Sequence, residues 1–232
     1  SFFSRDTIHE TYLVFFSLAV VVSFFLYSET RKSRYILFAA ASLAFIITIK
    51  ETYIMTFAVY ALSLAIAYGY EIVFLPKGAR FQHFKDVSTT FAIDCKKNKY
   101  AIGISIGVFL LINFLFYSSF FTYYAGIKGI LTTLAIWSKT GMHNECGHAK
   151  PFIYYFKVLY KFELPILVLG IAGFYYAFRR GNKFTVFVSL WAILIYIIYS
   201  LVPYKTPWLI LNIVLPFTIL AGIFVNGIFG IV

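Results

Sequence analysis

Long apolar runs alternate with short polar segments along the whole chain. A helix needs roughly 20 apolar residues to cross a hydrocarbon core about 30 Å thick. Runs that reach or approach this length cover residues 11–28, 35–49, 53–75, 101–121, 164–178, 184–202 and 208–232. The pattern predicts an all-α, polytopic membrane protein, with a single transmembrane domain over residues 1–232 and about seven spanning helices.

The amino-acid composition also favours a membrane protein. Of the 232 residues, 61% are hydrophobic and 12% are charged, whereas a soluble domain is about half apolar and a quarter charged. The aromatic share of 22% includes 19 tyrosines. A tyrosine ring suits the membrane interface because one end of it is apolar and the other can be wet.

The basic residues predict how the chain is oriented. The net charge of +11 comes from separate clusters and not from one basic face, so we expect no nucleic-acid partner. The clusters "TRKSR" and "RRGNK" and the polar segment 77–100 lie between apolar runs, and short loops rich in Lys and Arg stay in the cytoplasm. We therefore expect a cytoplasmic loop at 77–100 and an extracytoplasmic loop at 122–163. In the plasma membrane, the N-terminus of this chain would lie outside and its C-terminus inside.

The chain is expected to be an internal piece of a longer protein. It begins without Met and ends inside the apolar run "AGIFVNGIFGIV". Its two cysteines, Cys95 and Cys146, lie in different loops and supply no disulfide framework.

The polar segments on the predicted outer face carry most of the candidate chemistry. They are "SRDTIHE", "IKETY", the loop at 122–150 and "PYKTPW". Ionisable residues at membrane depth are costly unless they are paired or face water, so by default they point to a site. Lys50 and Glu51 interrupt an otherwise apolar stretch. They either form a surface hairpin, with side chains that reach water, or belong to such a site.

The segment "RDTIHE" places Asp6, His9 and Glu10 at positions i, i+3 and i+4, on one face of a helix. Asp6 or Thr7 also suits the role of a helix cap, with Glu10 near the first-turn amides. Capping leaves Arg5 and His9 unexplained, and the segment therefore remains a candidate site.

The segment "PYKTPW" contains two prolines, which favour a rigid turn between two spans. Lys205 is thereby held at the outer interface, flanked by Tyr204 and Trp208. A fixed cation at a membrane surface suits a lipid phosphate. The alternative is a purely interfacial anchor.

The loop before the fifth apolar run contains metal-capable side chains at His143, Glu145, Cys146 and His148. Their spacing matches no strong zinc pattern, so a divalent metal is a weak alternative to a loop folded over a pocket. Residues 151–162 follow, with an aromatic run and Lys157 and Lys161 four positions apart. They predict either an amphipathic interfacial helix or the first turns of the next span.

Four stretches together resemble a known family: "SRDTIHETYLVFF", "KETY", "GHAKPFIYYF" and "PYKTPWLILNIVLP". They resemble multispan proteins called flippase-activity-associated, which are similar to the dolichyl-phosphate-mannose protein mannosyltransferases and aminoarabinose transferases of the GT-C superfamily. The resemblance runs over nearly the whole chain. It implies a GT-C-like helical bundle that takes a polyprenyl-phosphate-linked sugar as co-substrate and glycosylates a glycan, lipid or protein acceptor on the extracytoplasmic face.

In GT-C enzymes the base is usually an acidic residue in the first outer loop, after the first span. No span precedes "SFFSRD" here, so the resemblance places the base upstream, with Asp6 and Glu10 as weak candidates within this chain. In the implied displacement, a carboxylate deprotonates the acceptor while the lipid phosphate leaves. Fixed cations stabilise the leaving charge, and Arg5, Lys50 and Lys205 are the hypothesised phosphate clamp.

The sugar and acceptor pocket is expected to involve Glu51, His9, His148 and Tyr204. Two other classes of function stay open. A flippase component or transporter would also bind a lipid-linked sugar, but such proteins often show repeated halves and broken helices, and no convincing repeat is visible. A non-catalytic scaffold would use the polar loops to bind a partner protein.

Overall fold

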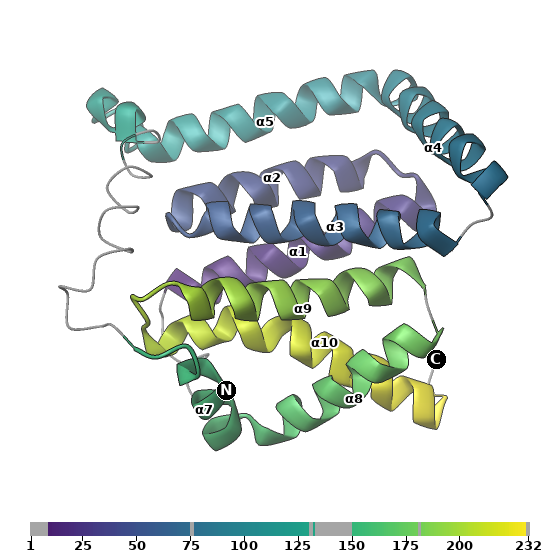
Figure 1. Cartoon of the computed structure of the whole chain (residues 1–232). Helices are drawn as coiled ribbons and strands as arrows, with labels where there is room; N and C mark the ends of the chain where they lie inside the picture. The colour runs from purple at the N-terminus through teal and green to yellow at the C-terminus, as the bar shows by residue number, and fades with distance from the viewer. Residues whose placement is uncertain (1–8, 75–76, 130–131, 133–149, 181, 231–232) are drawn as a thin grey trace. The chain divides into compact units, whose positions relative to one another are not determined.

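A computed structural model describes residues 9–74, 77–129, 132, 150–180 and 182–230 of the chain. These residues are helical almost throughout, with no β-strand among them, which confirms the predicted all-α class. Figure 1 shows the helices and their labels. In chain order they are α1 (His9–Thr30), α2 (Arg34–Ile49), α3 (Tyr53–Phe74), α4 (Lys77–Lys97), α5 (Lys99–Tyr117), η2 (Tyr124–Lys128), α7 (Tyr154–Phe162), α8 (Leu164–Arg180), α9 (Lys183–Leu201), η4 (Pro207–Leu209) and α10 (Ile210–Phe229).

Among the described residues, five helices are long and apolar enough to cross a membrane. They are α1, the first 18 residues of α3, α5, α9, and η4 together with α10. The count rises to six if α7 and α8 form one broken span. Helix α2 has 16 residues, and at 1.5 Å per residue it is about 24 Å long, short of a full crossing. The chain is a membrane protein by these helices, and the predicted number of seven spans exceeds the count of five to six.

Residues before the fifth apolar run form a separate helix. Helix α7 is bent by 109° from α8, and Glu163 at its end leaves the helical conformation with φ −132°. Pro165 in the first turn of α8 has no N–H to donate to the preceding turn, so a new helix can start there at no cost. Tyr155 and Leu159 are buried while Phe156 and Tyr160 are exposed, which makes α7 amphipathic.

The polar segment expected as a loop at 77–100 is largely helical, since α4 covers Lys77–Lys97. Its polar composition argues against a membrane span but not against a helix. Within α4, the Gln82 amide donates to the Asp86 carboxylate one turn later, at 2.9 Å, a pairing that stabilises exposed helices.

The chain divides into two compact units, and each is described by itself. The first unit contains residues 1–14, 51–66 and 131–232; the second contains residues 15–50 and 67–130. Helices α7, α8, α9 and α10 belong to the first unit, with the start of α1 and most of α3. Helices α2, α4 and α5 belong to the second.

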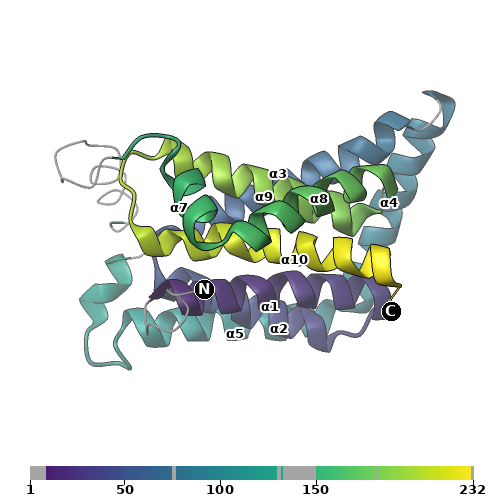
Figure 2. The same cartoon turned by 90° about the horizontal axis from the view of Figure 1, so that it is seen from below.

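Close helix packing builds the core of the first unit. Helices α8 and α10 lie side by side, as Figures 1 and 2 show. A Cβ added at Gly173 would collide with the backbone oxygen of Leu220, and one at Gly170 would lie 2.7 Å from the Phe217 ring. These glycines therefore allow the two helices to approach closely. Tyr60 of α3 packs edge-on against the buried Trp191 of α9, with ring centroids 5.2 Å apart.

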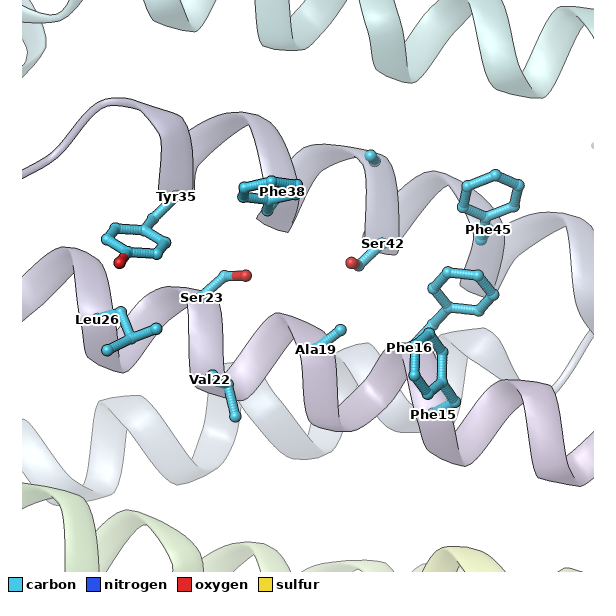
Figure 3. Close-up of a pocket in the computed structure, with 11 residues that line it drawn as sticks. Phe15, Phe16, Ala19, Val22, Ser23, Leu26, Tyr35, Phe38, Ser42 and Phe45 are labelled. Carbon is cyan, nitrogen blue, oxygen red and sulfur yellow. The ribbon is translucent and has the colours of Figure 1, made fainter.

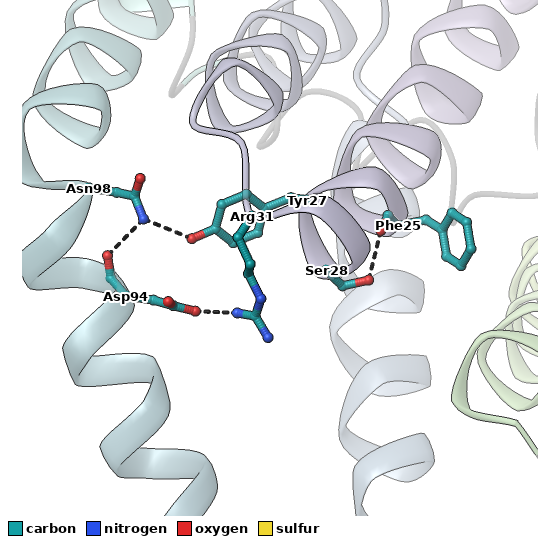
Figure 4. A network of polar contacts seen from close by, with 6 residues as sticks. All are labelled: Phe25, Tyr27, Ser28, Arg31, Asp94 and Asn98. Atoms are coloured by element: carbon teal, nitrogen blue, oxygen red, sulfur yellow. Dashed lines mark hydrogen bonds and ion pairs between the residues drawn. The ribbon is translucent and has the colours of Figure 1, made fainter.

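A polar network in the second unit holds the basic turn between α1 and α2 (Figure 4). The side-chain amide of the buried Asn98 donates to the Tyr27 hydroxyl at 3.0 Å. The oxygen of the same amide accepts from the Ser33 hydroxyl at 2.7 Å. Arg31, which has a positive φ of 53°, forms an ion pair with Asp94 of α4. The "TRKSR" segment is thus fixed against the junction of α4 and α5.

An open apolar cavity of about 440 Å³ lies between α1 and α2 in the second unit. Figure 3 shows rings such as Phe16 and Phe45 at one end, and the hydroxyls of Ser23 and Ser42 facing each other across it. Its lining residues carry no charge, so this cavity can accept hydrocarbon but offers no acid, base or cation for chemistry.

Candidate functional site

The predicted site residues divide into those that the structure describes and those that it does not. Arg5, Asp6, His143, Glu145 and His148 lie outside the described residues, together with Cys146 and Thr7. The described candidates are His9, Glu10, Lys50, Glu51, Tyr204 and Lys205. Glu10 and Lys205 are the buried members of this set, each 2% exposed.

Glu10 lies in the first turn of α1. Successive helical residues point about 100° apart, so His9 is exposed to solvent while the Glu10 side chain points into the protein. A carboxylate in a first turn is favoured by the positive end of the helix dipole. Glu10 also acts electrostatically on the hydroxyls of Tyr155 and Tyr199, which places all three groups in one region.

Lys205 connects two of the predicted outer segments. Its ammonium donates to the carbonyl oxygen of Val202 at 2.6 Å and to that of Lys150 at 3.1 Å. The Lys150 amide donates in turn to the carbonyl oxygen of Pro203 at 3.2 Å. An ammonium has three donors, and the described part of the chain uses two of them. We call this set of contacts the lysine clasp.

Helix α7 contacts the same turn as the lysine clasp. The Tyr155 hydroxyl donates to the carbonyl oxygen of Thr206 at 3.3 Å. Figure 1 shows α7 beside the connection between α9 and α10, where this contact is made. Glu10 also acts electrostatically on the Tyr155 hydroxyl, so Tyr155 is related both to the buried carboxylate and to the turn that holds the lysine clasp.

The turn that presents Lys205 is built as the two prolines predict. Helix α9 ends at Leu201, and Val202 is extended with ψ 126°. Thr206 is extended as well, and Pro207 opens the short helix η4. Burial away from water lowers the pKa of the Lys205 ammonium from its usual value, because the charged form is the one that loses hydration.

Three further buried hydroxyls lie in this region and were missed from the sequence. The Tyr199 hydroxyl of α9 lies beside those of Thr52 and Thr56 at the start of α3. Their side chains are 2%, 3% and 3% exposed. The Tyr199 hydroxyl interacts with those of both threonines, so the three hydroxyls are partners of one another. We call them the hydroxyl cluster.

A weak sequence signal for this cluster exists. Thr52 and Thr56 are four residues apart, which puts them on one face of α3. Thr52 belongs to the candidate segment "IKETY", where the charged residues drew the attention, and Thr56 lies within an apolar run. Tyr199 resembled the other interfacial tyrosines.

The remaining candidates lie at the margins. Lys50 follows the last residue of α2 and belongs to the second unit, so its place in a clamp with Arg5 and Lys205 stays a prediction. Glu51 and Tyr204 are half-buried. In the part of the chain that the structure describes, no three His, Cys, Asp or Glu side chains come close enough to hold a metal ion. The weak metal alternative of His143, Glu145 and His148 falls outside that part.

Comparison of the chain with models of protein families, with curated proteins and with solved structures finds no match. The function is therefore inferred from the chemistry of the site. At one end of the first unit, a buried carboxylate, a buried ammonium and several buried hydroxyls gather at the ends of membrane-length helices. Such a set can accept a proton, hold an anion and hydrogen-bond a polar ligand.

Proposed function

We propose that this protein is a membrane glycosyltransferase that takes its sugar from a polyprenyl-phosphate donor on the extracytoplasmic face. The observation that carries the proposal is the burial of both Glu10 and Lys205 in the first unit, where Tyr155 hydrogen-bonds next to Lys205 at Thr206 and feels the charge of Glu10. Burial of both a carboxylate and an ammonium is costly. A fold that tolerates both at helix ends of one unit supplies a base and an anion-binding group.

The location suits a donor that is half lipid and half sugar. Charged groups are most costly at the centre of a bilayer and cheaper near its surface. Glu10 lies in the first turn of α1, Thr52 precedes α3, and Lys205 lies between α9 and η4, so all three occupy helix ends. A prenyl chain could remain in hydrocarbon while its phosphate and sugar reach these groups.

The reaction would be a single displacement. Glu10 accepts a proton from an acceptor hydroxyl or amine as its oxygen or nitrogen attacks the anomeric carbon of the donor. The bond between that carbon and the phosphate oxygen breaks, and the lipid phosphate leaves with the electron pair. Lys205 stabilises the departing charge with its remaining N–H. A positioned general base contributes about 10²–10⁴-fold in rate.

The first test uses Glu10→Gln in the full-length protein, which keeps the shape of the side chain and removes its charge. Transfer from radiolabelled polyprenyl-phosphate sugars, measured in membranes, should fall at least about 100-fold. Donor binding should change little, because the phosphate contacts remain. Glu163→Gln is the matched control: it is another largely buried acid of the first unit, 8% exposed, and should leave the transfer rate unchanged.

Equal transfer by Glu10→Gln and the unaltered protein would remove Glu10 as the base. If the unaltered protein moves labelled lipid to the opposite leaflet but transfers no sugar from any donor, the protein is a flippase component. If neither activity is found, the scaffold alternative is favoured.

A further inference from the structure

The cavity between α1 and α2 has two chemically different ends (Figure 3). At one end, the rings of Phe16 and Phe45 stack with their centroids 4.6 Å apart and bridge the two helices. At the other end, Leu26 and Tyr35 border the turn that joins α1 to α2. Small side chains such as Ala19 line the length between them. The cavity therefore runs from a pair of stacked rings to the turn.

The dimensions of the cavity suit one lipid chain. Tyr35 and Phe45 are ten positions apart on α2, which corresponds to about 15 Å of helix. That length is half of a hydrocarbon core about 30 Å thick, and thus one leaflet. Helix α1 is long and apolar enough to cross the membrane, so a cavity along it lies among hydrocarbon. Its volume of about 440 Å³ is within the range of ligand pockets, about 300–1,000 Å³.

Positive charge gathers at the turn end of the cavity. The segments 29–34 and 94–99 are joined there by the hydrogen bonds of Asn98 and by the ion pair of Arg31 with Asp94. Together these segments carry six basic residues and two acids. Basic pockets at the membrane surface attract anionic lipid head groups. The turn therefore offers a counter-charge to a lipid whose chain lies in the cavity.

Arg34 connects this charge to the cavity itself. Its guanidinium lies over the Tyr35 ring, 4.9 Å from the ring centroid, and donates to the Tyr35 hydroxyl at 2.9 Å. Tyr35 is one of the lining residues. A guanidinium has five N–H donors, and it can bind a phosphate through two of them at once. Arg34 and its neighbour Lys32 are both exposed, so a phosphate can reach them from the membrane surface.

We propose that the cavity between α1 and α2 binds an acyl chain of an anionic phospholipid, whose phosphate is held by Arg34 and Lys32. The lipid belongs to the leaflet that the turn faces, which the basic residues predict to be the cytoplasmic one. A zwitterionic phospholipid fits less well, because its head group adds a cation beside a basic turn. A partner helix would bring no phosphate to Arg34. The inference goes beyond the proposed glycosyltransferase and does not rest on it.

The test uses the full-length protein in nanodiscs with photoactivatable phospholipids. The probes are phosphatidylglycerol and phosphatidylcholine with the same diazirine-bearing acyl chain, each at a low fraction in unlabelled phosphatidylcholine. Irradiation joins the chain to the residues that it contacts, and mass spectrometry of peptides locates the adducts. Phosphatidylglycerol should label residues 15–45 at least about fivefold more than phosphatidylcholine, since one basic residue near the surface contributes about that factor.

Two variants separate the chain from the head group. Ala19→Phe fills the cavity and should reduce the adducts of both probes in residues 15–45 to background. The double variant Lys32→Gln with Arg34→Gln should keep the phosphatidylcholine adducts and lose the preference for phosphatidylglycerol. Thermal unfolding shows whether each variant is folded, and Ser42→Leu, at another lining position, replaces Ala19→Phe if that variant is not.

Arg179→Gln is the matched control for the head group. Arg179 stacks on Tyr175, 5.3 Å from the ring centroid, and bonds to its hydroxyl at 3.0 Å, as Arg34 does with Tyr35. It lies in the other basic cluster predicted to be cytoplasmic, and Tyr175 does not line the cavity. This variant should keep the full preference for phosphatidylglycerol in residues 15–45.

Several outcomes would overturn the site. Equal labelling by the two probes, or an unchanged preference in the folded double variant, removes the head-group contact. Adducts that persist in the folded cavity-filling variant place the chain elsewhere, and a cavity without adducts is left to a partner helix. Unlabelled polyprenyl phosphate that displaces the probe at a lower concentration than phosphatidylglycerol would assign the cavity to the donor lipid. None of these readouts measures sugar transfer, so this inference and the proposed function can fail separately.

Discussion

Burial lowers the proton affinity of the Lys205 side chain below that of a surface lysine. Its pKa is lowered because desolvation penalises the ammonium. In the unfolded chain the same group titrates near the ordinary value of 10.5. Between these two values the folded protein binds fewer protons than the unfolded chain, so the free energy of unfolding rises with pH in that window. Below the folded-state pKa the cost of burying the charge is fully present.

Phosphate binding should change in the opposite direction across the same window. Only the ammonium attracts the donor phosphate, so affinity for polyprenyl phosphate should fall as pH rises through the lowered pKa of Lys205. Titration of binding and of thermal stability on one sample checks both slopes. Lys205→Arg is the control, because a guanidinium stays charged throughout, and its binding should be flat. A flat profile in the unaltered protein would rule out Lys205 as the phosphate ligand.

Single residues show what the sequence could and could not indicate about the site. Glu10 and Lys205 stand out because ionisable groups beside apolar runs are unusual. The partners of Lys205 are backbone carbonyls at Val202 and Lys150, and no residue type marks a carbonyl that will accept a long-range bond. The cluster at Thr52, Thr56 and Tyr199 depends on how α3 meets α9, which the sequence pattern does not specify.

At the scale of elements, the close approach of α8 to α10 is the contact most sensitive to small changes. Gly173 faces the backbone of α10 at Leu220. Backbone atoms, unlike the end of a flexible side chain, cannot move aside to make room for a Cβ. Gly173→Ala should therefore lower the free energy of unfolding by about 1–3 kcal/mol, the usual cost of overpacking. Thermal unfolding in detergent, followed by the fluorescence of the three tryptophans, measures the effect.

Gly222 provides the matched comparison. It lies on α10 itself, and a Cβ added there meets nothing within 4 Å. Gly222→Ala should be neutral or slightly stabilising, since Ala is the better helix former by about 1 kcal/mol. Equal unfolding temperatures for the two variants would contradict the packing of α8 on α10.

The helices themselves were largely predictable, and the departures have physical reasons. Apolar runs long enough to cross a bilayer must satisfy every backbone group internally, so they become helices. The polar segment that forms α4 carries no such constraint, because its backbone could equally bond to water. Its helical state depends on local pairs such as Gln82 with Asp86. Pro165 is compatible with the break between α7 and α8 that the structure shows. A proline is equally compatible with a continuous but kinked span, so the sequence left the choice between the two open.

For the whole molecule, orientation in the membrane decides whether the site can meet an extracytoplasmic donor. The two native cysteines lie on opposite sides of the predicted topology. Cys95 is a free, half-buried thiol of α4, in the segment 77–100 that the basic residues place in the cytoplasm. Cys146 falls outside the described residues, in the loop predicted to be extracytoplasmic. Replacing either cysteine with serine leaves the other as the single cysteine of the chain.

A maleimide that cannot cross membranes then reports the orientation. In intact cells that express the Cys95→Ser variant, Cys146 should be labelled. In cells that express Cys146→Ser, labelling of Cys95 should require permeabilisation, and the label it then takes up shows that the thiol is reactive. The reverse pattern would place Glu10 and Lys205 in the cytoplasm, because α1 and α3 start on the side where α9 ends. A site on that face would meet cytoplasmic donors, and transfer on the extracytoplasmic face would be excluded whatever the chemistry of its residues.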